Sequence, residues 1–276
     1  MVLFLCFFVM SFLSAVIFIK ALLNMLSKSK YNRINFRNEL IPAGTGLLIP
    51  LVFIIVLVFY MFFGGRYFSW VSNSLLILLV LVLGLALFGV LDDLLGDRSV
   101  GGFSGHFGEL FKGNLTTGVL KAIGGVIISF FAAAPFSVNI FVHVLNTLLI
   151  ALFINVFNLL DLRPGRTLKV FLLLGLIVSV FSWQSAYWST WGIFLGPAIV
   201  LLWVDLTERG MLGDVGSNVL GGFIGFSCVV SFSETVNLFV FVILVAVNLY
   251  SESNSITGLI KKNSILRWLD EMGRKV

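Results

Sequence analysis

Residues 74–93 read Ser-Leu-Leu-Ile-Leu-Leu-Val-Leu-Val-Leu-Gly-Leu-Ala-Leu-Phe-Gly-Val-Leu-Asp-Asp, an apolar run that ends on two adjacent carboxylates. A helix needs about 20 apolar residues to cross a bilayer, so this stretch predicts a transmembrane helix with Asp92 and Asp93 at its end. Two neighbouring carboxylates repel each other unless a cation or a hydrogen-bonded network offsets the repulsion. The pair therefore indicates either a site for a hard cation such as Mg²⁺ or a marker of the membrane boundary.

The whole chain has the composition of a membrane protein. It has 276 residues, of which 59% are hydrophobic and 11% are charged, whereas soluble domains average about a quarter charged residues. Nine apolar segments predict an all-α, polytopic helical bundle. They cover residues 3–24, 43–63, 73–92, 117–135, 138–157, 168–183, 188–204, 217–232 and 235–251.

The C-terminal tail has a different pattern from the apolar segments. Leu259, Ile265, Trp268 and Leu269 recur at near-helical spacing among charged residues, which predicts an amphipathic helix on the inner membrane surface. We therefore expect a transmembrane bundle over residues 1–251 and a cytoplasmic tail helix over residues 252–276.

Charged residues gather on one side of the predicted bundle. Basic residues follow the first, third, fifth and seventh segments and fill the tail, whereas the opposite side has only Arg66. The positive-inside rule places the basic side and the C-terminus in the cytoplasm and the N-terminus outside. Acidic residues share the basic side although they contribute little to orientation. A cytoplasmic site for a phosphate-bearing molecule, in a multi-pass protein of the cell membrane, explains their position.

A second acidic motif reads Gly213-Asp214-Val215-Gly216-Ser217. Its small residues let the backbone come close to a ligand. We expect Ser217 to cap the N-terminus of the eighth segment, where the amide groups and the helix dipole favour an anion. A capped turn with a solvated Asp214 is the alternative.

A third motif places Asn155, Asn158 and Asp161 three residues apart, so that all three can share one helical face. The motif favours either a site inside the bundle or hydrogen bonds between helices, worth on the order of 1 kcal/mol each. Lys121 lies one turn into the fourth segment, where it either meets a pyrophosphate or extends to the membrane surface.

The order and spacing of these motifs resemble a known family. Leu91-Asp92-Asp93, Asn155-x-x-Asn158-Leu-x-Asp161 and Leu-Gly-Asp214-x-Gly-Ser217 are similar to motifs of the polyprenyl-phosphate N-acetylhexosamine-1-phosphate transferases. This family includes phospho-N-acetylmuramoyl-pentapeptide transferase and the UDP-N-acetylglucosamine-1-phosphate transferases of cell-wall polymers. The similarity extends over about residues 1–250 and includes Ile41-Pro42-Ala43-Gly44-Thr45-Gly46 at the start of the second segment.

The resemblance implies a reaction at the cytoplasmic membrane face, in which a polyprenyl phosphate such as undecaprenyl phosphate attacks the β-phosphate of a UDP-sugar. UMP leaves, and a lipid-linked phospho-sugar for envelope synthesis remains. By this resemblance the protein is a Mg²⁺-dependent transferase that binds no nucleic acid. The catalytic residues would be Asp92, Asp93, Lys121 and Asp214, with Asp93 and Asp214 as ligands of Mg²⁺. The substrate-binding residues would be Asn155, Asn158, Asp161, Arg163, Arg166 and Ser217.

Two departures from the family pattern concern the residues of the predicted site. Pro164 replaces the second acid of the family's fifth-segment motif, and Arg163 and Arg166 appear beside it, where either guanidinium can bind a phosphate through two hydrogen bonds. No histidine follows His143, although family members have a histidine-rich cytoplasmic motif there.

These departures motivate an alternative function, a non-catalytic relative that binds lipid-linked sugar, nucleotide or a wall-synthesis partner. A transporter is disfavoured because its acids would lie at mid-membrane depth. The sequence leaves a homodimer open. The Gly- and Phe-rich loop over residues 101–118 is a candidate cover for a bound lipid or nucleotide.

Overall fold

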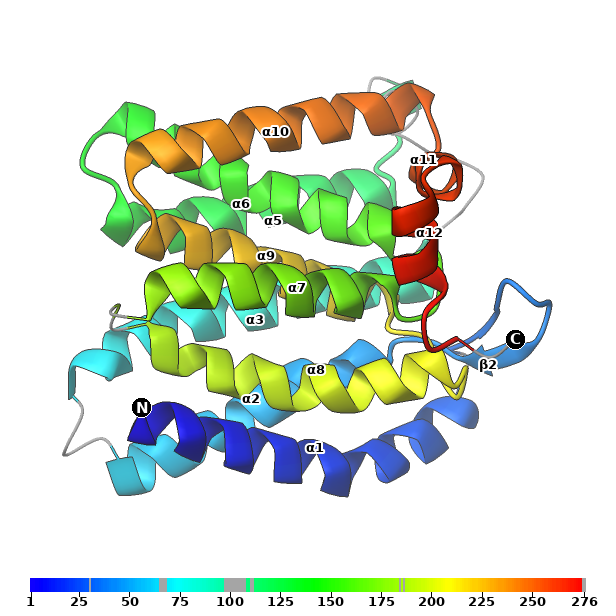
Figure 1. Ribbon diagram of the computed structural model, residues 1–276, viewed down its shortest axis with the longest axis horizontal. Helices are drawn as coiled ribbons and strands as arrows, with labels where there is room; N and C mark the ends of the chain where they lie inside the picture. The colour runs from blue at the N-terminus through cyan, green and yellow to red at the C-terminus, as the bar shows by residue number, and fades with distance from the viewer. Residues whose placement is uncertain are drawn as a thin grey trace.

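The computed structural model describes residues 1–29, 31–64, 69–96, 108–109, 112–183, 185 and 187–274; for residues 64 and 69–74 it describes only the backbone. Long helices run back and forth across the molecule (Figure 1). They are α1 (Val2–Ser27), α2 (Leu48–Phe59), α3 (Ser69–Leu95), α5 (Thr117–Ala133), α6 (Ile140–Leu160), α7 (Arg166–Ser182), α8 (Trp191–Leu206), α9 (Gly213–Ser231) and α10 (Glu234–Ser253). Short helical turns are η1 (Thr45–Leu47), η2 (Tyr60–Gly64), η3 (Ala134–Phe136) and η4 (Trp188–Thr190).

The prediction of an all-α polytopic bundle is confirmed. In the described part of the chain, eight helical segments are long and apolar enough to cross a membrane. The segment predicted over residues 168–183 forms α7, which has 17 residues and is too short to be one of the eight. At about 1.5 Å per residue, such a helix spans roughly 25 Å against a hydrocarbon core of about 30 Å. All nine predicted segments are therefore helical, and α7 is the short one.

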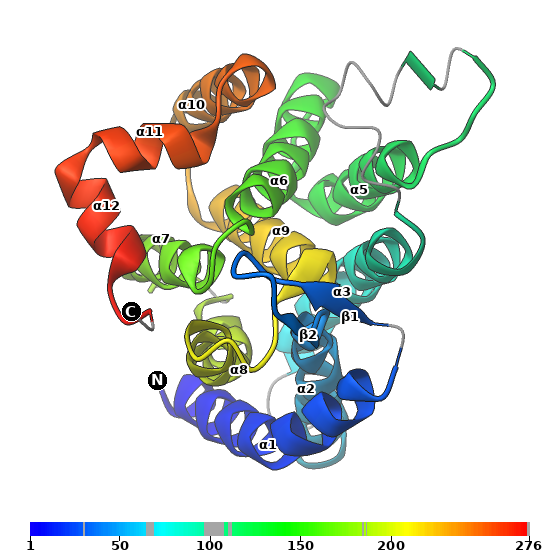
Figure 2. The same cartoon turned by 90° about the vertical axis from the view of Figure 1, so that its right-hand side faces the viewer.

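Helix α9 forms the centre of the bundle, with 83% of its most apolar window buried, against 17% for α1 and α10 at the edge. Viewed from the end, α3, α6, α7 and α8 surround α9 (Figure 2). Glycines allow this close packing, because a side chain at Gly221 or Gly225 would collide with the backbone of α6 at 2.7 Å.

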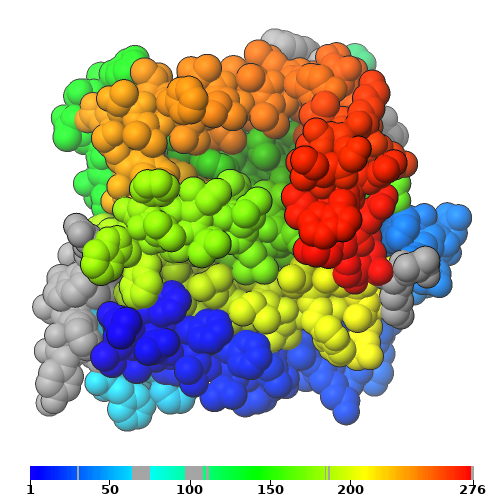
Figure 3. All heavy atoms as spheres, viewed as in Figure 1, coloured from blue at the N-terminus to red at the C-terminus, as the bar shows by residue number. Residues whose placement is uncertain are grey.

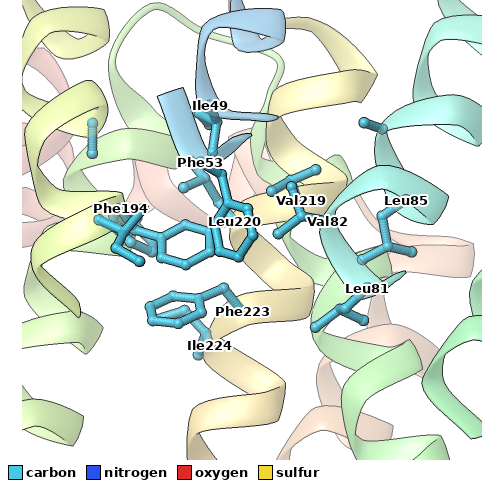
Figure 4. Packing of buried hydrophobic residues seen from close by; sticks show 14 of the residues in the cluster. Ile49, Phe53, Leu81, Val82, Leu85, Phe194, Val219, Leu220, Phe223 and Ile224 are labelled. Atoms are coloured by element: carbon cyan, nitrogen blue, oxygen red, sulfur yellow. The ribbon is translucent and has the colours of Figure 1, made fainter. Parts of the chain in front are cut away.

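Aromatic and aliphatic side chains fill the space around α9 (Figure 4). The rings of Phe194 and Phe223 stack with their centroids 3.7 Å apart, and Trp191 meets Phe223 edge-on at 4.7 Å. Such ring pairs contribute about 0.5–1.5 kcal/mol beyond their buried area. This core fixes α8 and α9 side by side and thereby the position of the chain that links them.

A small β-hairpin that is not expected from the sequence lies at the end of the bundle where α3 and α6 finish and α5 and α9 begin (Figure 2). We call this the polar end. Strand β1 (Asn32–Ile34) pairs antiparallel with β2 (Leu40–Pro42), with Arg33 opposite Ile41. The hairpin is held to the α8–α9 link because the amide of Met211 donates to the Pro42 carbonyl at 2.8 Å. It covers the end of α3 and the start of α9.

The tail forms two short helices, α11 (Ile256–Lys262) and α12 (Ser264–Glu271), so the prediction of one continuous amphipathic helix is wrong. The break occurs at Asn263, whose side chain leaves the helical path and accepts hydrogen bonds from the amides of Ile265 and Leu266 at 3.0 and 3.1 Å. The tail lies against the end of the bundle beside the hairpin loop (Figure 3). The division into bundle and tail at residue 251 stays a prediction.

Candidate active site

A cavity of about 730 Å³ opens at the polar end of the bundle. Its walls come from the end of α3, the start of α5, the end of α6, the start of α9 and the β-hairpin. Seven of the residues predicted for the site line it: Asp92, Asp93, Lys121, Asn158, Asp161, Arg163 and Asp214. Three motifs that are far apart in the sequence therefore meet in one cavity.

Lys121 lies between two of the carboxylates. Its ammonium group donates to Oδ2 of Asp214 at 2.6 Å and also to Oδ2 of Asp92. Thr116 positions the lysine by capping α5, since its hydroxyl accepts the amide of Val119 at 3.3 Å. The lysine side chain is 17% exposed. Of the two alternatives for Lys121, the structure shows a partly buried contact with carboxylates and not an extended side chain at the membrane surface.

Asn158 completes this network. With its amide nitrogen directed to Oδ1 of Asp214 at 2.7 Å and its amide oxygen to the ammonium of Lys121 at 3.0 Å, the side chain satisfies both neighbours. Asp214 thus receives a hydrogen bond on each oxygen. Charge-assisted bonds of this kind are stronger than neutral ones, so the three side chains hold one another in position.

Asp93 caps α9 from another helix. Its two oxygens accept the amides of Asp214 at 3.1 Å and Val215 at 3.3 Å. The predicted N-cap role of Ser217 is wrong, because α9 begins at Gly213, four residues earlier, and Ser217 is buried inside the helix. The anion-favouring N-terminus predicted for this segment exists, and the carboxylate of Asp93 occupies it.

Glycine is required where these segments meet. Gly213 has φ of +76°, and a Cβ there would lie 2.8 Å from Oδ2 of Asp93. A Cβ on Gly89 would lie 2.5 Å from the Cα of Val215. The glycines beside the two acidic motifs therefore let the backbones of α3 and α9 touch, which brings Asp93 to the end of α9.

A second group of acids lies on another wall of the cavity. Asp161 ends α6, and Asp205 ends α8, where its Oδ2 accepts the amide of Gly165 at 2.7 Å. Burial, followed by the negative charges of Asp205, Asp214 and Asp93, raises the pKa of Asp161 well above its ordinary value. Sequence reasoning missed Asp205 as a site residue because it reads there as one more charge at a membrane boundary.

Three predicted substrate-binding residues lie outside this cavity. Asn155 donates to Oδ1 of Asn248 at 2.5 Å and joins α6 to α10, which is the helix–helix contact that its spacing left open. Ser217 donates to the Asp214 carbonyl at 3.3 Å. Arg166 binds both carboxylate oxygens of Asp270 in the tail, at 2.7 and 3.0 Å. None of these three residues lines the cavity, and their roles in substrate binding stay predictions.

Comparison with known protein families finds no family model that matches the chain, and comparison with curated proteins finds no match either. The family resemblance thus depends on the motif residues themselves. Most of the predicted loop cover over residues 101–118 lies outside the described residues; in the described part, Glu109 accepts hydrogen bonds from Lys112 and Asn114.

The carboxylates of the cavity are of the type that Mg²⁺ prefers as ligands. In the parts of the chain that the structure describes, no three His, Cys, Asp or Glu side chains are grouped as a metal centre. Mg²⁺ usually takes one or two carboxylates and completes its shell with water and substrate phosphates. Asp92 and Asp214 fit this pattern, because their Oδ2 atoms already hold one cation, the ammonium of Lys121, between them. Asp93 fits less well, since both of its oxygens accept backbone amides.

Proposed function

We propose that this protein transfers a phospho-sugar of the N-acetylhexosamine-1-phosphate type from a UDP-sugar to a polyprenyl phosphate, with release of UMP. The contact of Lys121 with both Asp92 and Asp214 is the observation that carries the proposal. Phosphoryl transfer depends mainly on charge neutralisation and alignment of the reacting oxygens, and a lysine between carboxylates at the edge of a bilayer can supply both. The cavity volume of about 730 Å³ is in the range of pockets that hold ligands of this size.

In the proposed reaction, an oxygen of the lipid phosphate forms a bond to the β-phosphorus of the UDP-sugar. The bond from that phosphorus to the bridging oxygen breaks, and UMP leaves with the electron pair. Lys121 would hold the negative oxygens of the phosphates, because its ammonium is directed into the cavity. Asn158 would keep the lysine and Asp214 aligned. Asp93 would position the start of α9.

The same residues could hold Mg²⁺ beside the phosphates. The donor set favours Asp92 and Asp214 as its protein ligands, in place of the predicted pair Asp93 and Asp214. When bound there, the ion would neutralise charge on the phosphate oxygens. Asp161 and Asp205 also line the cavity, from the ends of α6 and α8, and would face the nucleotide.

The charges at the two ends of the bundle support a cytoplasmic location of the reaction in a cell membrane. Among the described residues, the end of the bundle that carries the cavity also carries the lysines and arginines of the loops and tail. The opposite end has Glu234 and no lysine or arginine in its described links. By the positive-inside rule, this distribution of charge supports a cytoplasmic position for the cavity.

Purified protein with undecaprenyl phosphate, Mg²⁺ and a panel of UDP-sugars tests the proposal through UMP release. We expect turnover with at least one UDP-sugar, and a loss of about a hundredfold or more in D214N and K121M, because each removes a charged group from the phosphate site. N248A, which loses a helix–helix contact between α10 and α6 outside the cavity, is the matched control and keeps most of the activity. Turnover that is unchanged in D214N and K121M would exclude the proposed site.

A second candidate function, binding of the same ligands without transfer, has a specific observation in its favour. Pro164 lines the cavity at the position where the transferases that the motifs resemble have an acid, and Arg166 is held by the tail and does not line this cavity. Equilibrium binding of UDP-sugar by the purified protein, without UMP release in the presence of polyprenyl phosphate and Mg²⁺, would favour this function over the transferase.

A further inference from the structure

A second cavity, of about 360 Å³, lies beside the acidic one and has the opposite charge. Its walls come from the hairpin loop, the link between α6 and α7, and the two tail helices. Six basic residues line it: Arg37, Arg163, Arg166, Lys261, Arg267 and Arg274. The acidic residues of the lining are Asp270 and Glu271. We call this the basic cavity.

One of the two acids of the lining is already neutralised by ion pairs. Asp270 accepts two hydrogen bonds from Arg166 and one from Arg274 at 2.6 Å. By contrast, the side chains of Arg163, Lys261 and Arg267 make no hydrogen bond or ion pair with any residue in the described parts of the chain. Arg163 only stacks over the ring of Phe36, at 5.0 Å. Among the described residues, three cationic groups of the lining therefore have no ion-pair partner, against one acid without a partner, Glu271.

The tail helix α12 separates charged from apolar side chains. Arg267, Asp270 and Glu271 follow helical spacing and line the basic cavity. Ile265, Trp268 and Leu269 each precede one of these three residues by two positions, which puts them on the opposite face of the helix. Their side chains are 70%, 64% and 38% exposed. Apolar residues exposed at the end of a transmembrane bundle lie where lipid acyl chains begin.

We propose that the basic cavity binds the phosphate headgroup of an anionic membrane phospholipid, while the apolar face of α12 rests among the acyl chains. With its apolar face among the acyl chains, α12 would lie at the boundary between acyl chains and headgroups, and its charged face would hold the cavity at the depth of the headgroups. Basic pockets at this depth attract anionic lipids. The bound headgroup would hold the tail against α7 through the residues around Asp270. Because Phe36 and Arg163 line both cavities, the lipid would lie next to the acidic site.

Titration of the full-length protein in a neutral detergent with a short-chain phosphatidylglycerol tests the proposal. We expect saturable binding that weakens about fivefold in K261Q and again about fivefold in K261Q/R267Q, since one basic group near the surface contributes about that factor. The matched control is K262Q, which removes the same charge from the next residue of α11, outside the lining of the cavity. All three side chains are exposed, so the variants should fold, as melting temperatures without lipid would verify.

Three outcomes would overturn the proposal. If K262Q weakens binding as much as K261Q, the attraction is diffuse and the cavity is not the site. If phosphatidylcholine binds as tightly as phosphatidylglycerol, the basic residues do not recognise the headgroup. If inorganic pyrophosphate competes as strongly as the lipid, the occupant is a soluble anion. The assay measures no turnover, so its result is independent of the proposed transferase activity.

Discussion

Asp93 accepts backbone amides of α9 with both oxygens, whereas Asp92 directs one oxygen to Lys121. The two neighbours therefore respond differently to the same isosteric change. We expect D93N to lower the free energy of unfolding by about 1–3 kcal/mol. The reason is that the side-chain NH₂ group of Asn would face a backbone N–H at the start of α9, so that one hydrogen bond is lost and two donors oppose each other. In D92N the side-chain oxygen can still accept from Lys121, so the melting temperature should change less.

Thermal unfolding in detergent, followed by intrinsic fluorescence, measures this difference between the two variants. UMP release measured on the same samples should fall in both variants, in D92N with little loss of folded protein. Equal losses of stability in D92N and D93N would contradict the separate roles of the two carboxylates.

At the scale of the elements, the start of α9 depends on Gly213. An alanine there meets an unfavourable φ of +76° and a contact of 2.8 Å with Asp93. Gly113 offers a matched control, since its φ is +86° and a Cβ there would contact nothing within 4 Å. Both G213A and G113A carry a backbone cost of about 1 kcal/mol. We expect only G213A to lose more than this in thermal unfolding and to lose UMP release, and equal effects would show that the Asp93 contact is unimportant.

The docking of α12 depends on one ion-paired carboxylate. Burial would raise the pKa of Asp270, but hydrogen bonds from Arg166 and Arg274 outweigh it and hold the pKa below the ordinary value of 3.8. A lowered pKa in the docked tail means that this stabilisation is present above about pH 4 and is lost as the pH falls through the lowered value.

Hydrogen exchange of residues 256–271 measures this docking. We expect the protection factors, which correct for the pH dependence of intrinsic amide exchange, to be high at neutral pH, lower below the pKa of Asp270, and low at neutral pH in D270N. E271Q changes the next residue, whose carboxylate has no hydrogen-bond partner in the described parts of the chain, and should leave the exchange unchanged. Exchange in D270N that equals the unmodified protein at every pH would show that the ion pair does not hold the tail.

The transmembrane helices could be predicted because the signal is local: an apolar run of sufficient length has few other stable states in a membrane. The start of α9 could not, since Gly213-Asp214-Val215-Gly216 has the composition of a turn. The backbone just before this segment is fixed by long-range hydrogen bonds, from the amide of Met211 to the Pro42 carbonyl and from the amide of Gly46 to the Leu212 carbonyl. These contacts fix the point at which α9 begins. The break at Asn263 was also missed, because apolar spacing on both sides of it continues across the two short helices.

The site was predictable in its residue types and not in its contacts. The motif order indicated that Asp92, Asp214 and Lys121 belong to one site. That Lys121 bridges the two acids depends on the packing of α3, α5 and α9, and no local spacing encodes it. Arg166 shows the opposite case: its place beside Asp161 in the sequence suggested a substrate contact, but the tail supplies Asp270 as its partner from 104 residues away.

At the scale of the whole molecule, the orientation in the membrane can be tested with two serines at the ends of α10. Ser233 and Ser255 are both exposed N-cap residues, and each accepts a backbone amide, from Val236 and Gly258 respectively. Ser233 lies at the end with few charges, and Ser255 lies between α10 and α11 at the end with the two cavities. Replacement by cysteine removes a similar cap in both variants, at a cost of about 1 kcal/mol each.

In a background of C6S and C228S, we expect a membrane-impermeant maleimide to label S233C in intact cells, and to label S255C only after the membrane is permeabilised. The reason is that, in the proposed orientation, the lysines and arginines around the basic cavity would keep that end in the cytoplasm during insertion. Mass spectrometry of the purified variants gives the labelled fraction, and the cysteine-free background is the control. Labelling of S255C in intact cells would place both cavities outside, away from cytoplasmic UDP-sugars, and would contradict the proposed transfer reaction.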